Sequence, residues 1–229
     1  MRPRLLSRGV PLPAWTWDTF ELPAAANTMA ALPGLTEDIL AMPPGSVMLA
    51  HLLFPHYPYI YKENCSIHAS LQELKGRSLV SENMTEYNTA ESREERYRLY
   101  LQQLQCLYVR LDQLFRQMQA AGIFENSIII LHGDHGSRIG LHDPYVENLD
   151  VLSKEDYTDA FSTLFAVKLP GKPGGYDLSI HPLEYLLAEA LTLPVDSAAA
   201  RTTKESEPYV YLRRGGTEDL VRVLYSPVS

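Results

Sequence analysis

Two short apolar runs, separated by one long amphipathic segment, constrain the fold of this chain more than any other feature. The first run, S-V-M-L-A-H-L-L-F, occupies residues 46–54, and the second, I-I-I-L, occupies residues 128–131. Turn-forming residues bound both runs, which is the pattern of strands buried on both faces. Between them, apolar side chains recur at helical spacing from about Ser92 to Ala121, and Gly122 is a suitable C-terminal stop. A helix followed by an apolar strand is half of a crossover unit, which predicts an α/β fold with a parallel sheet.

Weaker patterns extend this order of elements. Residues 1–45 are rich in Pro and Ala, so we expect an irregular segment with one short helix at Leu35–Met42 that the following prolines end. The α/β domain is then expected to occupy residues 46–229. Later patterns predict a strand over 159–170, a helix over His181–Leu193, and a hairpin formed by 209–212 and 221–225. The core stripe expected for the long helix comprises Tyr97, Leu101, Leu104, Tyr108, Leu111, Phe115 and Met118.

Composition narrows the class of protein. The residues are 45% apolar and 21% charged, which are ordinary globular values. The formal net charge of -8 argues against nucleic acid as the main partner, because phosphate backbones select basic surfaces. No window approaches the roughly 18 apolar residues that span a bilayer, so the chain as written is expected to be soluble. Cys65 and Cys106 form no C-x-x-C pair; we expect two independent thiols, with one disulfide as the alternative.

Chemistry concentrates where the second apolar run ends. It leads directly into Asp134 and His135, and ligand sites of doubly wound sheets lie at the carboxyl ends of strands. Gly133 and Gly136 allow the backbone to turn tightly there. A carboxylate beside an imidazole suits a divalent transition metal. The alternative is a plain turn in which the aspartate caps a backbone group and the histidine is incidental.

The first run also delivers a histidine to its end, His56, within a loop that prolines stiffen. We expect His56 to face the same polar pocket as the Asp-His pair, and His142 to reach that pocket from the following loop. Arg138 is a candidate contact for an anionic group, since guanidinium matches phosphate and sulfate geometry; its alternative is an ordinary surface role. His51 and His132 lie inside the runs, where a structural role in the core or behind the site is the simpler interpretation.

Together these motifs resemble a known family. H-Y-P-Y at residues 56–59, D-H-G-S-R at residues 134–138 and the later segment A-F-S-T-L-F-A-V-K-L-P resemble the alkaline phosphatase and sulfatase superfamily. The similarity is greatest to its bacterial sulfatase-like hydrolase and transferase branch, which includes lipoteichoic acid synthase and phosphoethanolamine transferases. It extends over roughly residues 40–170. It implies an alkaline-phosphatase-like, parallel-rich sheet flanked by helices.

The resemblance also implies roles for individual residues. Asp134 and His135 would bind the catalytic metal, which is zinc, manganese, calcium or magnesium. His56 would contact the transferred anionic group of a sulfate or phosphate ester, with His142 as a second contact. The metal would act as a Lewis acid, and the reaction would pass through a covalent enzyme intermediate. Members of this branch are often tethered to a membrane and carry an extracytoplasmic catalytic domain.

The chain departs from the family pattern at its start. The family's first acidic metal ligand and its Thr, Ser or modified Cys nucleophile are not recognisable in the first 45 positions, so we assign no catalytic nucleophile. We therefore expect a C-terminal portion of the family domain, without the membrane-tethered N-terminal region, that binds metal weakly and has little turnover. A non-catalytic relic or partner-binding module is the alternative. These residues are compatible with a sulfate ester or a phosphate ester as the substrate, and with a hydrolase or a transferase reaction.

Overall fold

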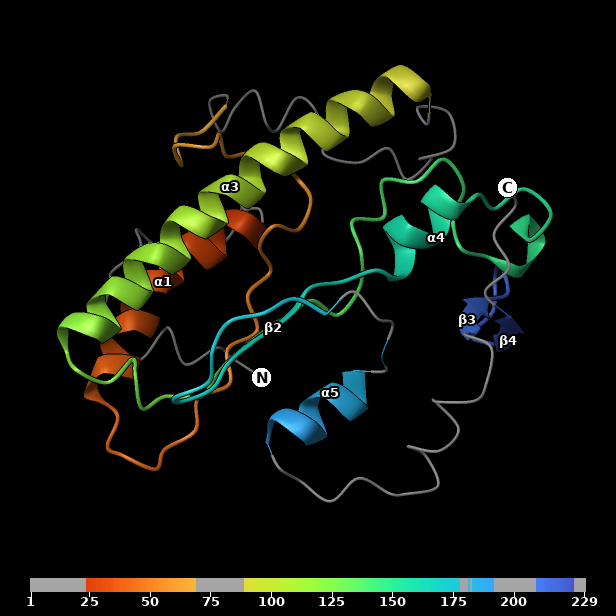
Figure 1. Cartoon of the computed structure of the whole chain (residues 1–229). Helices are drawn as coiled ribbons and strands as arrows, with labels where there is room; N and C mark the ends of the chain where they lie inside the picture. Colours follow the sequence, from red (N-terminus) through yellow and green to blue (C-terminus); the bar gives the residue numbers. More distant parts are fainter. Residues whose placement is uncertain (1–23, 69–88, 178–180, 182, 192–208, 225–229) are drawn as a thin grey trace. The chain divides into compact units, whose positions relative to one another are not determined.

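The computed structural model describes residues 24–68, 89–177, 181, 183–191 and 209–224 (Figure 1). They form two compact units. The first contains the described residues up to His68 together with Glu94–Ile123, and the second contains residues 89–93 and the described residues from Phe124 onward. The elements in chain order are α1 (Ala24–Ala41), α3 (Ala90–Ala120), β1 (Ile129–His132), the 3₁₀ helix η4 (Val146–Asn148), α4 (Lys154–Phe161), β2 (Phe165–Lys168), α5 (Leu183–Ala190), β3 (Tyr209–Arg213) and β4 (Leu220–Leu224).

Helix α1 is longer than predicted. It begins at Ala24 rather than Leu35, so the described part of segment 1–45 is largely helical instead of irregular; residues 1–23 lie outside the described residues. The alanines of its first turns have the highest helix propensity of any residue, which offsets the cost of Pro33 inside the helix. The hydroxyl of Thr36 donates to the carbonyl oxygen of Leu32 at 2.9 Å. The prolines after Met42 end the helix as expected.

Helix α3 confirms the clearest prediction of the sequence. Gly122 ends it with a φ of 73°, and the N–H of Ile123 closes the end by donating to the carbonyl oxygen of Met118 at 3.0 Å. The buried side chains, however, are Gln103, Cys106 and Met118. The predicted core stripe is correct for Met118 and wrong for Leu101 and Tyr108, which are about half exposed.

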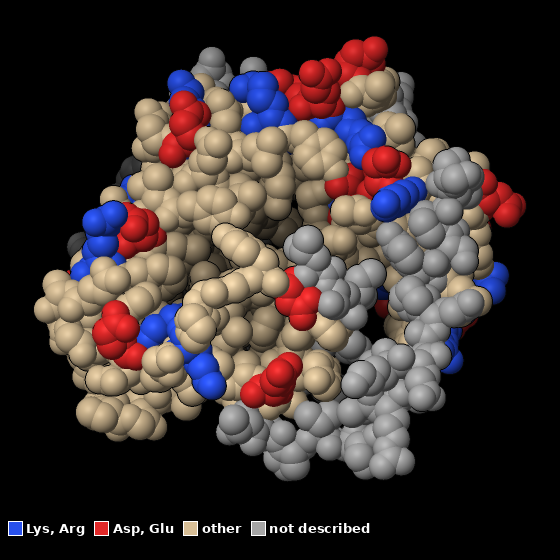
Figure 2. Space-filling model, in the orientation of Figure 1, with Lys and Arg blue, Asp and Glu red and all other residues tan. Residues whose placement is uncertain are grey.

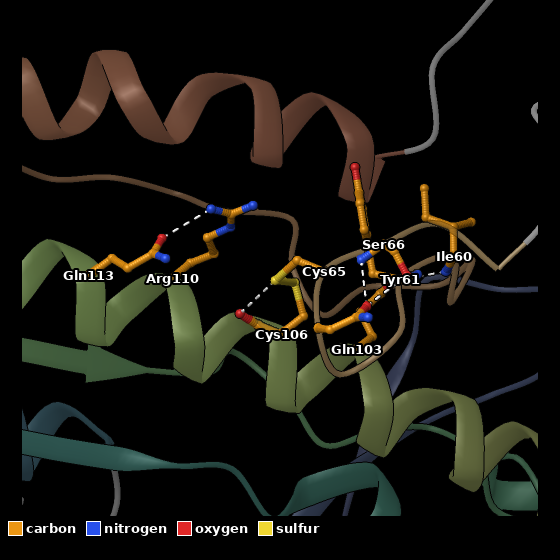
Figure 3. Close-up of a disulfide and its surroundings, with 9 residues drawn as sticks. Ile60, Tyr61, Cys65, Ser66, Gln103, Cys106, Arg110 and Gln113 are labelled. Carbon is orange, nitrogen blue, oxygen red and sulfur yellow. Dashed lines mark hydrogen bonds between the residues drawn. A yellow bond between two sulfur atoms is a disulfide. The ribbon is translucent and has the colours of Figure 1, made fainter.

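The core of the first unit joins α1, α3 and the loop between them. Its buried residues are Ala25, Phe54, Ile60, Tyr61 and Cys106. A disulfide links Cys65 to Cys106 across a sequence separation of 41 residues, so the expectation of two independent thiols is wrong (Figure 3). Spacing could not reveal this bond, because it depends on the loop folding back onto α3.

The first apolar run is not a strand. Residues 46–53 have no regular secondary structure and are mostly exposed, with Val47 93% and Leu49 89% accessible, and burial begins only at Phe54. Within the part of the chain that the structure describes, no strand pairs with this run. An apolar run becomes a buried strand only when neighbouring strands take up its N–H and C=O groups. The bonds Phe54–Pro55 and Tyr57–Pro58 are both cis.

The second apolar run is a strand, as predicted, but its partner runs the other way. Strand β1 pairs antiparallel with β2, in a register that places Ile129 opposite Lys168 and His132 opposite Phe165. The parallel-rich sheet expected from the sequence is therefore not observed. Helix α4 ends at Phe161 before β2 begins at Phe165, so the strand predicted over 159–170 is a helix end followed by a shorter strand.

The predictions of a late helix and of a closing hairpin are confirmed within the described residues; residues 182, 192–193 and 225 of the predicted ranges lie outside them. Strands β3 and β4 form an antiparallel hairpin, and α5 lies within the predicted helix. Leu152, Tyr157 and Leu212 form a small core that joins the hairpin to α4 and the preceding loop. The described fold thus consists of helices and two small antiparallel sheets.

The surface mixes charges of both signs. On the face drawn in Figure 2, basic and acidic side chains lie among wide areas of other residues rather than gathered by sign. On α3 they form ion pairs one turn apart, between Arg98 and Glu95 at 2.6 Å and between Arg116 and Asp112 at 2.7 Å. Among the helices of the described ranges, none combines the length and the apolar character needed to cross a bilayer.

Candidate functional site

The loop that follows β1 is held against the C-terminal end of α4. The N–H of Gly133 donates to the carbonyl oxygen of Leu164 at 3.0 Å, and that of Gly136 to the carbonyl oxygen of Ala160 at 3.1 Å. The N–H of Arg138 donates to the carbonyl oxygen of Asp159 at 2.9 Å. These three bonds determine where the side chains between them lie.

Close approach, rather than an unusual turn, requires the glycines. A Cβ at Gly136 would lie 2.1 Å from the carbonyl oxygen of Asp159, and a Cβ at Gly133 would lie 2.0 Å from the Oγ1 of Thr163. Neither glycine has a positive φ. Gly136 therefore lets this loop pack against backbone and Gly133 lets it pack against a side chain, which is a different reason from the tight turn that we inferred from the sequence.

The Asp134 and His135 side chains lie together at the exit of β1. The Oδ2 of Asp134 is 3.7 Å from the Nε2 of His135. The Nδ1 of His135 lies 2.6 Å from the carbonyl oxygen of Gly136, and a carbonyl only accepts, so Nδ1 carries the proton and Nε2 keeps its lone pair. Two ligands about 2.1 Å from a tetrahedral zinc ion lie about 3.4 Å apart. The Oδ2 to Nε2 separation in Asp134 and His135 is somewhat longer than this ligand spacing.

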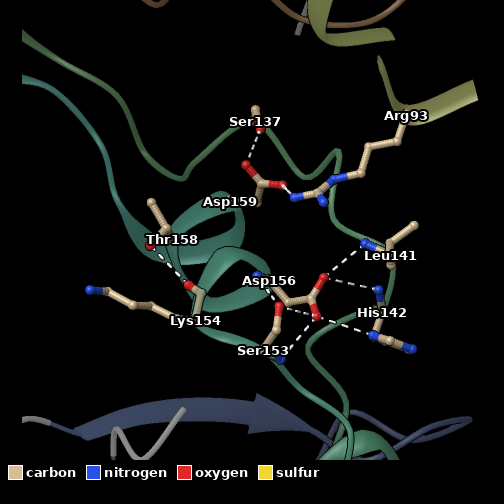
Figure 4. A network of polar contacts seen from close by, with 9 residues as sticks. All are labelled: Arg93, Ser137, Leu141, His142, Ser153, Lys154, Asp156, Thr158 and Asp159. Atoms are coloured by element: carbon tan, nitrogen blue, oxygen red, sulfur yellow. Dashed lines mark hydrogen bonds and ion pairs between the residues drawn. The ribbon is translucent and has the colours of Figure 1, made fainter. Parts of the chain in front are cut away.

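His142 is bound to a carboxylate that the sequence analysis did not single out. Its Nδ1 lies 3.1 Å from the Oδ2 of Asp156, a side chain at the start of α4 that is 2% exposed (Figure 4). Burial raises the pKa of Asp156, but hydrogen bonds from the N–H and hydroxyl of Ser153 and from the ring and N–H of His142 outweigh it and lower the pKa to about 2. Asp156 is therefore ionised at neutral pH.

Arg138 is exposed and has a φ of 55°, in the left-handed region that few non-glycine residues adopt. The adjacent chain is anchored by Asp159, whose Oδ1 accepts from the hydroxyl of Ser137 at 3.1 Å. The other oxygen of Asp159 pairs with the Nη2 of Arg93 at 3.4 Å (Figure 4). The contacts of Ser137 and Arg138 with Asp159 therefore fix the loop that carries Arg138.

His56 belongs to the first unit, whereas Asp134 and His135 belong to the second. The His56 ring is exposed, and its Nδ1 contacts the carbonyl oxygen of Tyr57. The main chain of His56 is held from α3, because the Nε2 of Gln103 donates to its carbonyl oxygen at 3.0 Å. That His56 shares a pocket with Asp134 stays a prediction.

Two other histidines are both exposed. His51 is exposed, so a place in the core is wrong for this residue, while a role behind the site stays a prediction. His132 is also exposed, and its Nδ1 lies 3.2 Å from the carbonyl oxygen of Gly133. Both results follow from the shallow burial of their segments, since an apolar run predicts a buried histidine only if the run itself is buried.

The sequence analysis missed Asp156 and Gln103. Ser153-Lys154-Glu155-Asp156 matches the pattern of a helix start in which a Ser and an acidic residue three positions later cap each other, and this signal could have revealed Asp156. No sequence pattern indicated a role for Gln103, because a single glutamine on an amphipathic helix is expected to face solvent.

No protein-family model matches the chain, and no solved structure matches it. It is 31% identical over 132 residues to "Lipoteichoic acid synthase 1" of Bacillus subtilis (strain 168), a match that covers 55% of this chain and 17% of that protein. It is also 31% identical over 78 residues to "Lipoteichoic acid synthase" of Staphylococcus aureus (strain USA300), covering 33% of this chain and 12% of that protein. Thus the chain spans less than a fifth of the length of these curated relatives. This chain is therefore similar to lipoteichoic acid synthases over about half of its own length, which supports the resemblance to the sulfatase-like superfamily carried by D-H-G and H-Y-P-Y.

Proposed function

We propose that Asp134 and His135 form part of the divalent-metal site of a sulfatase-like enzyme that transfers or hydrolyses anionic esters. The observation that carries this proposal is the pairing of the Asp134 Oδ2 with the Nε2 of His135 at 3.7 Å. The Nδ1–H of His135 is already engaged by a backbone carbonyl, as is usual for metal-binding histidines, so Nε2 is left to bind. The carboxylate and the imidazole are ligands for zinc and manganese, and the carboxylate also suits magnesium and calcium.

Similarity to proteins named as synthases favours transfer over hydrolysis. Lipoteichoic acid is a phosphodiester polymer, which favours a phosphate ester over a sulfate ester as the substrate class. In this proposal His142 and His56 bind the anionic group through ring nitrogens, and Arg138 adds a guanidinium. The metal, when bound, would polarise a phosphoryl oxygen.

The disulfide bears on the compartment. Disulfides persist in oxidising environments and are rare in the cytosol. A bond between Cys65 and Cys106 is therefore expected in a chain that folds outside the cytosol. We propose an extracytoplasmic location, which is also the location that the family resemblance implies.

A non-catalytic, partner-binding module is the second candidate. Within the described residues, no group of three or more His, Cys, Asp or Glu side chains gathers as a metal site. Zinc sites normally use three or four protein ligands, so Asp134 and His135 alone would hold a metal weakly. The non-catalytic candidate is therefore a protein that keeps the fold and two metal ligands but does not turn over substrate.

Binding of Mn²⁺ to the whole chain, followed by electron paramagnetic resonance, tests the metal site. We expect weak binding that Asp134→Asn or His135→Gln reduces by about tenfold or more, because each removes one of two ligands. Asp150→Asn is the matched control, since Asp150 is an exposed carboxylate elsewhere in the second unit. Equal affinity in Asp134→Asn and the wild type would contradict the proposal.

Turnover tests whether the catalytic site of this chain is complete. With Mn²⁺ present, we expect the chain to release little nitrophenol from bis(p-nitrophenyl) phosphate, because no nucleophile is assigned to it. Release well above that of the buffer, if Asp134→Asn abolished it, would show a complete enzyme and would contradict the non-catalytic module. Release that persists in Asp134→Asn would show that any hydrolysis comes from elsewhere.

A further inference from the structure

We propose that Asp156 is a positioning residue for His142: it holds the imidazole with Nδ1 as the hydrogen-bond donor, so that Nε2 faces outward as the atom that meets the anionic group. This inference rests on the proposed function, which places His142 at the substrate, and adds a residue that neither the sequence motifs nor the relatives' names indicate. Asp156 itself does not touch the substrate.

One carboxylate holds both the main chain and the ring of His142. The Oδ1 of Asp156 accepts from the N–H of Leu141 at 2.8 Å and from the N–H of His142 at 3.2 Å. Its Oδ2 accepts from the Nδ1 of His142 at 3.1 Å (Figure 4). The ring is 41% exposed while the carboxylate is 2% exposed, so the contact orients an accessible imidazole from a buried anchor.

Helix capping explains only part of this arrangement. In the capping box of α4 the N–H of Ser153 donates to the Oδ2 of Asp156 at 3.0 Å, and the hydroxyl of Ser153 accepts from the N–H of Asp156 at 3.1 Å. The three donors from Leu141 and His142 are not needed to start the helix. They tie the loop that carries His142 to the rigid first turn of α4.

The ionised carboxylate determines the tautomer. Because the pKa of Asp156 is lowered to about 2, both of its oxygens only accept at neutral pH. The Nδ1 of His142 must therefore carry a proton, and Nε2 of the neutral ring carries the lone pair. In a protonated ring both nitrogens donate, so Nδ1–H still bonds to the carboxylate while Nε2–H can donate to an anionic ester oxygen.

The backbone around the carboxylate leaves little freedom to rearrange. A Cβ at Gly140 would lie 2.8 Å from the Oδ1 of Asp156, so the loop passes directly over this oxygen. The orientation of the His142 ring is thus set by the packing of its loop on α4. A side chain that is held against a helix is positioned more accurately than one on an unsupported loop.

Asp156→Asn tests the inference through the tautomer. An amide NH₂ in the Oδ1 position would meet two backbone N–H groups, of Leu141 and His142, which cannot reverse their polarity. In the Oδ2 position it would meet one such N–H, of Ser153, and two groups that can adjust, the Ser153 hydroxyl and the His142 ring. The NH₂ therefore takes the Oδ2 position and donates to Nδ1, which moves the ring proton to Nε2.

The measurement is ¹⁵N NMR of the whole chain labelled at histidine, with the His142 signals assigned by their loss in His142→Asn. We expect the Nδ1–H tautomer in the wild type and in the control Ser153→Ala, which removes a donor to the same carboxylate but leaves the ring contact. We expect the Nε2–H tautomer in Asp156→Asn. An Nε2–H tautomer in the wild type would overturn the inference even if Asp156→Asn did not fold, and so would an unchanged tautomer in a folded Asp156→Asn.

Inorganic phosphate separates this inference from the proposed function. If His142 meets an anionic group, phosphate shifts its Nε2 signal in the wild type and in Ser153→Ala. It binds about tenfold more weakly to Asp156→Asn, because the amide NH₂ cannot accept from the Nδ1–H of a protonated, anion-binding ring. A wild-type ring with the Nδ1–H tautomer but no response to phosphate would reject the substrate role of His142 while supporting its positioning by Asp156.

Discussion

Gln103 on helix α3 binds the backbone of Ile60 in the loop that packs against this helix: the Oε1 of Gln103 accepts the Ile60 N–H at 2.8 Å (Figure 3). The same oxygen accepts the N–H of Tyr61 at 3.2 Å, and the Nε2 of Gln103 donates to the carbonyl oxygen of His56. One fully buried side chain therefore satisfies three backbone groups of the segment that carries His56. Three residues further along α3, Cys106 holds the same loop through its disulfide with Cys65.

Replacing Gln103 with leucine should lower the free energy of unfolding by about 3 kcal/mol, because two backbone N–H groups and one carbonyl lose their partner at similar side-chain volume. Urea unfolding followed by circular dichroism measures this change. Gln105→Leu, at an exposed position of the same helix, is the control and should change stability by less than about 0.5 kcal/mol. Equal stability of the two variants would show that the Gln103 contacts contribute little.

Removing the disulfide in the double variant Cys65→Ser with Cys106→Ser should cost about 3–4 kcal/mol, because a closure of 41 residues limits the unfolded chain. Thermal unfolding with and without dithiothreitol measures the effect. The reductant should lower the melting temperature of the wild type and leave that of the double variant unchanged. A wild type insensitive to dithiothreitol would contradict the bond.

Gly136→Ala should destabilise the second unit by about 3 kcal/mol or more, because the new methyl group would lie 2.1 Å from a backbone oxygen of Asp159 that cannot move aside. Chemical denaturation provides the measurement, and Mn²⁺ binding should fall as well, since Asp134 and His135 precede this glycine. Gly174→Ala is the matched control: a Cβ there meets nothing within 4 Å. Tolerance of Ala at both positions would reject the close packing of the loop on α4.

Asp156 should make stability depend on acidity. Its pKa is lowered from 3.8 to about 2 in the folded chain, so the unfolded chain binds a proton first as the pH falls. The stabilisation is therefore complete above about pH 5 and is lost as the pH falls through 2; it amounts to about 2 kcal/mol. Unfolding of the wild type and of Asp156→Asn at pH 6 and pH 2 measures it. The stability difference between them should shrink by most of this amount at pH 2, whereas Asp150→Asn should track the wild type at both.

Local patterns predicted the local elements of this fold. Helical spacing and Gly122 predicted α3 to within two residues at each end, and the run at 128–131 predicted the place of β1. The candidate site also has a part that local sequence predicts and a part that it does not. Sequence order alone places Asp134 and His135 at the end of a strand, but nothing near Asp156 in the sequence shows that its carboxylate reaches back to His142.

The sequence by itself determined where α3, β1, α5 and the β3–β4 hairpin form and which residues could bind a metal, because periodicity, prolines and glycines act over a few neighbouring positions. Only the tertiary structure decided which segments meet: β1 with an antiparallel β2, Cys65 with Cys106, Gln103 with the His56 loop. These pairings join residues tens of positions apart, and their free energy comes from burial and hydrogen bonds that exist only once the segments are together. For the same reason residues 46–53 remain an exposed apolar run, since an apolar pattern predicts burial only where a partner covers it.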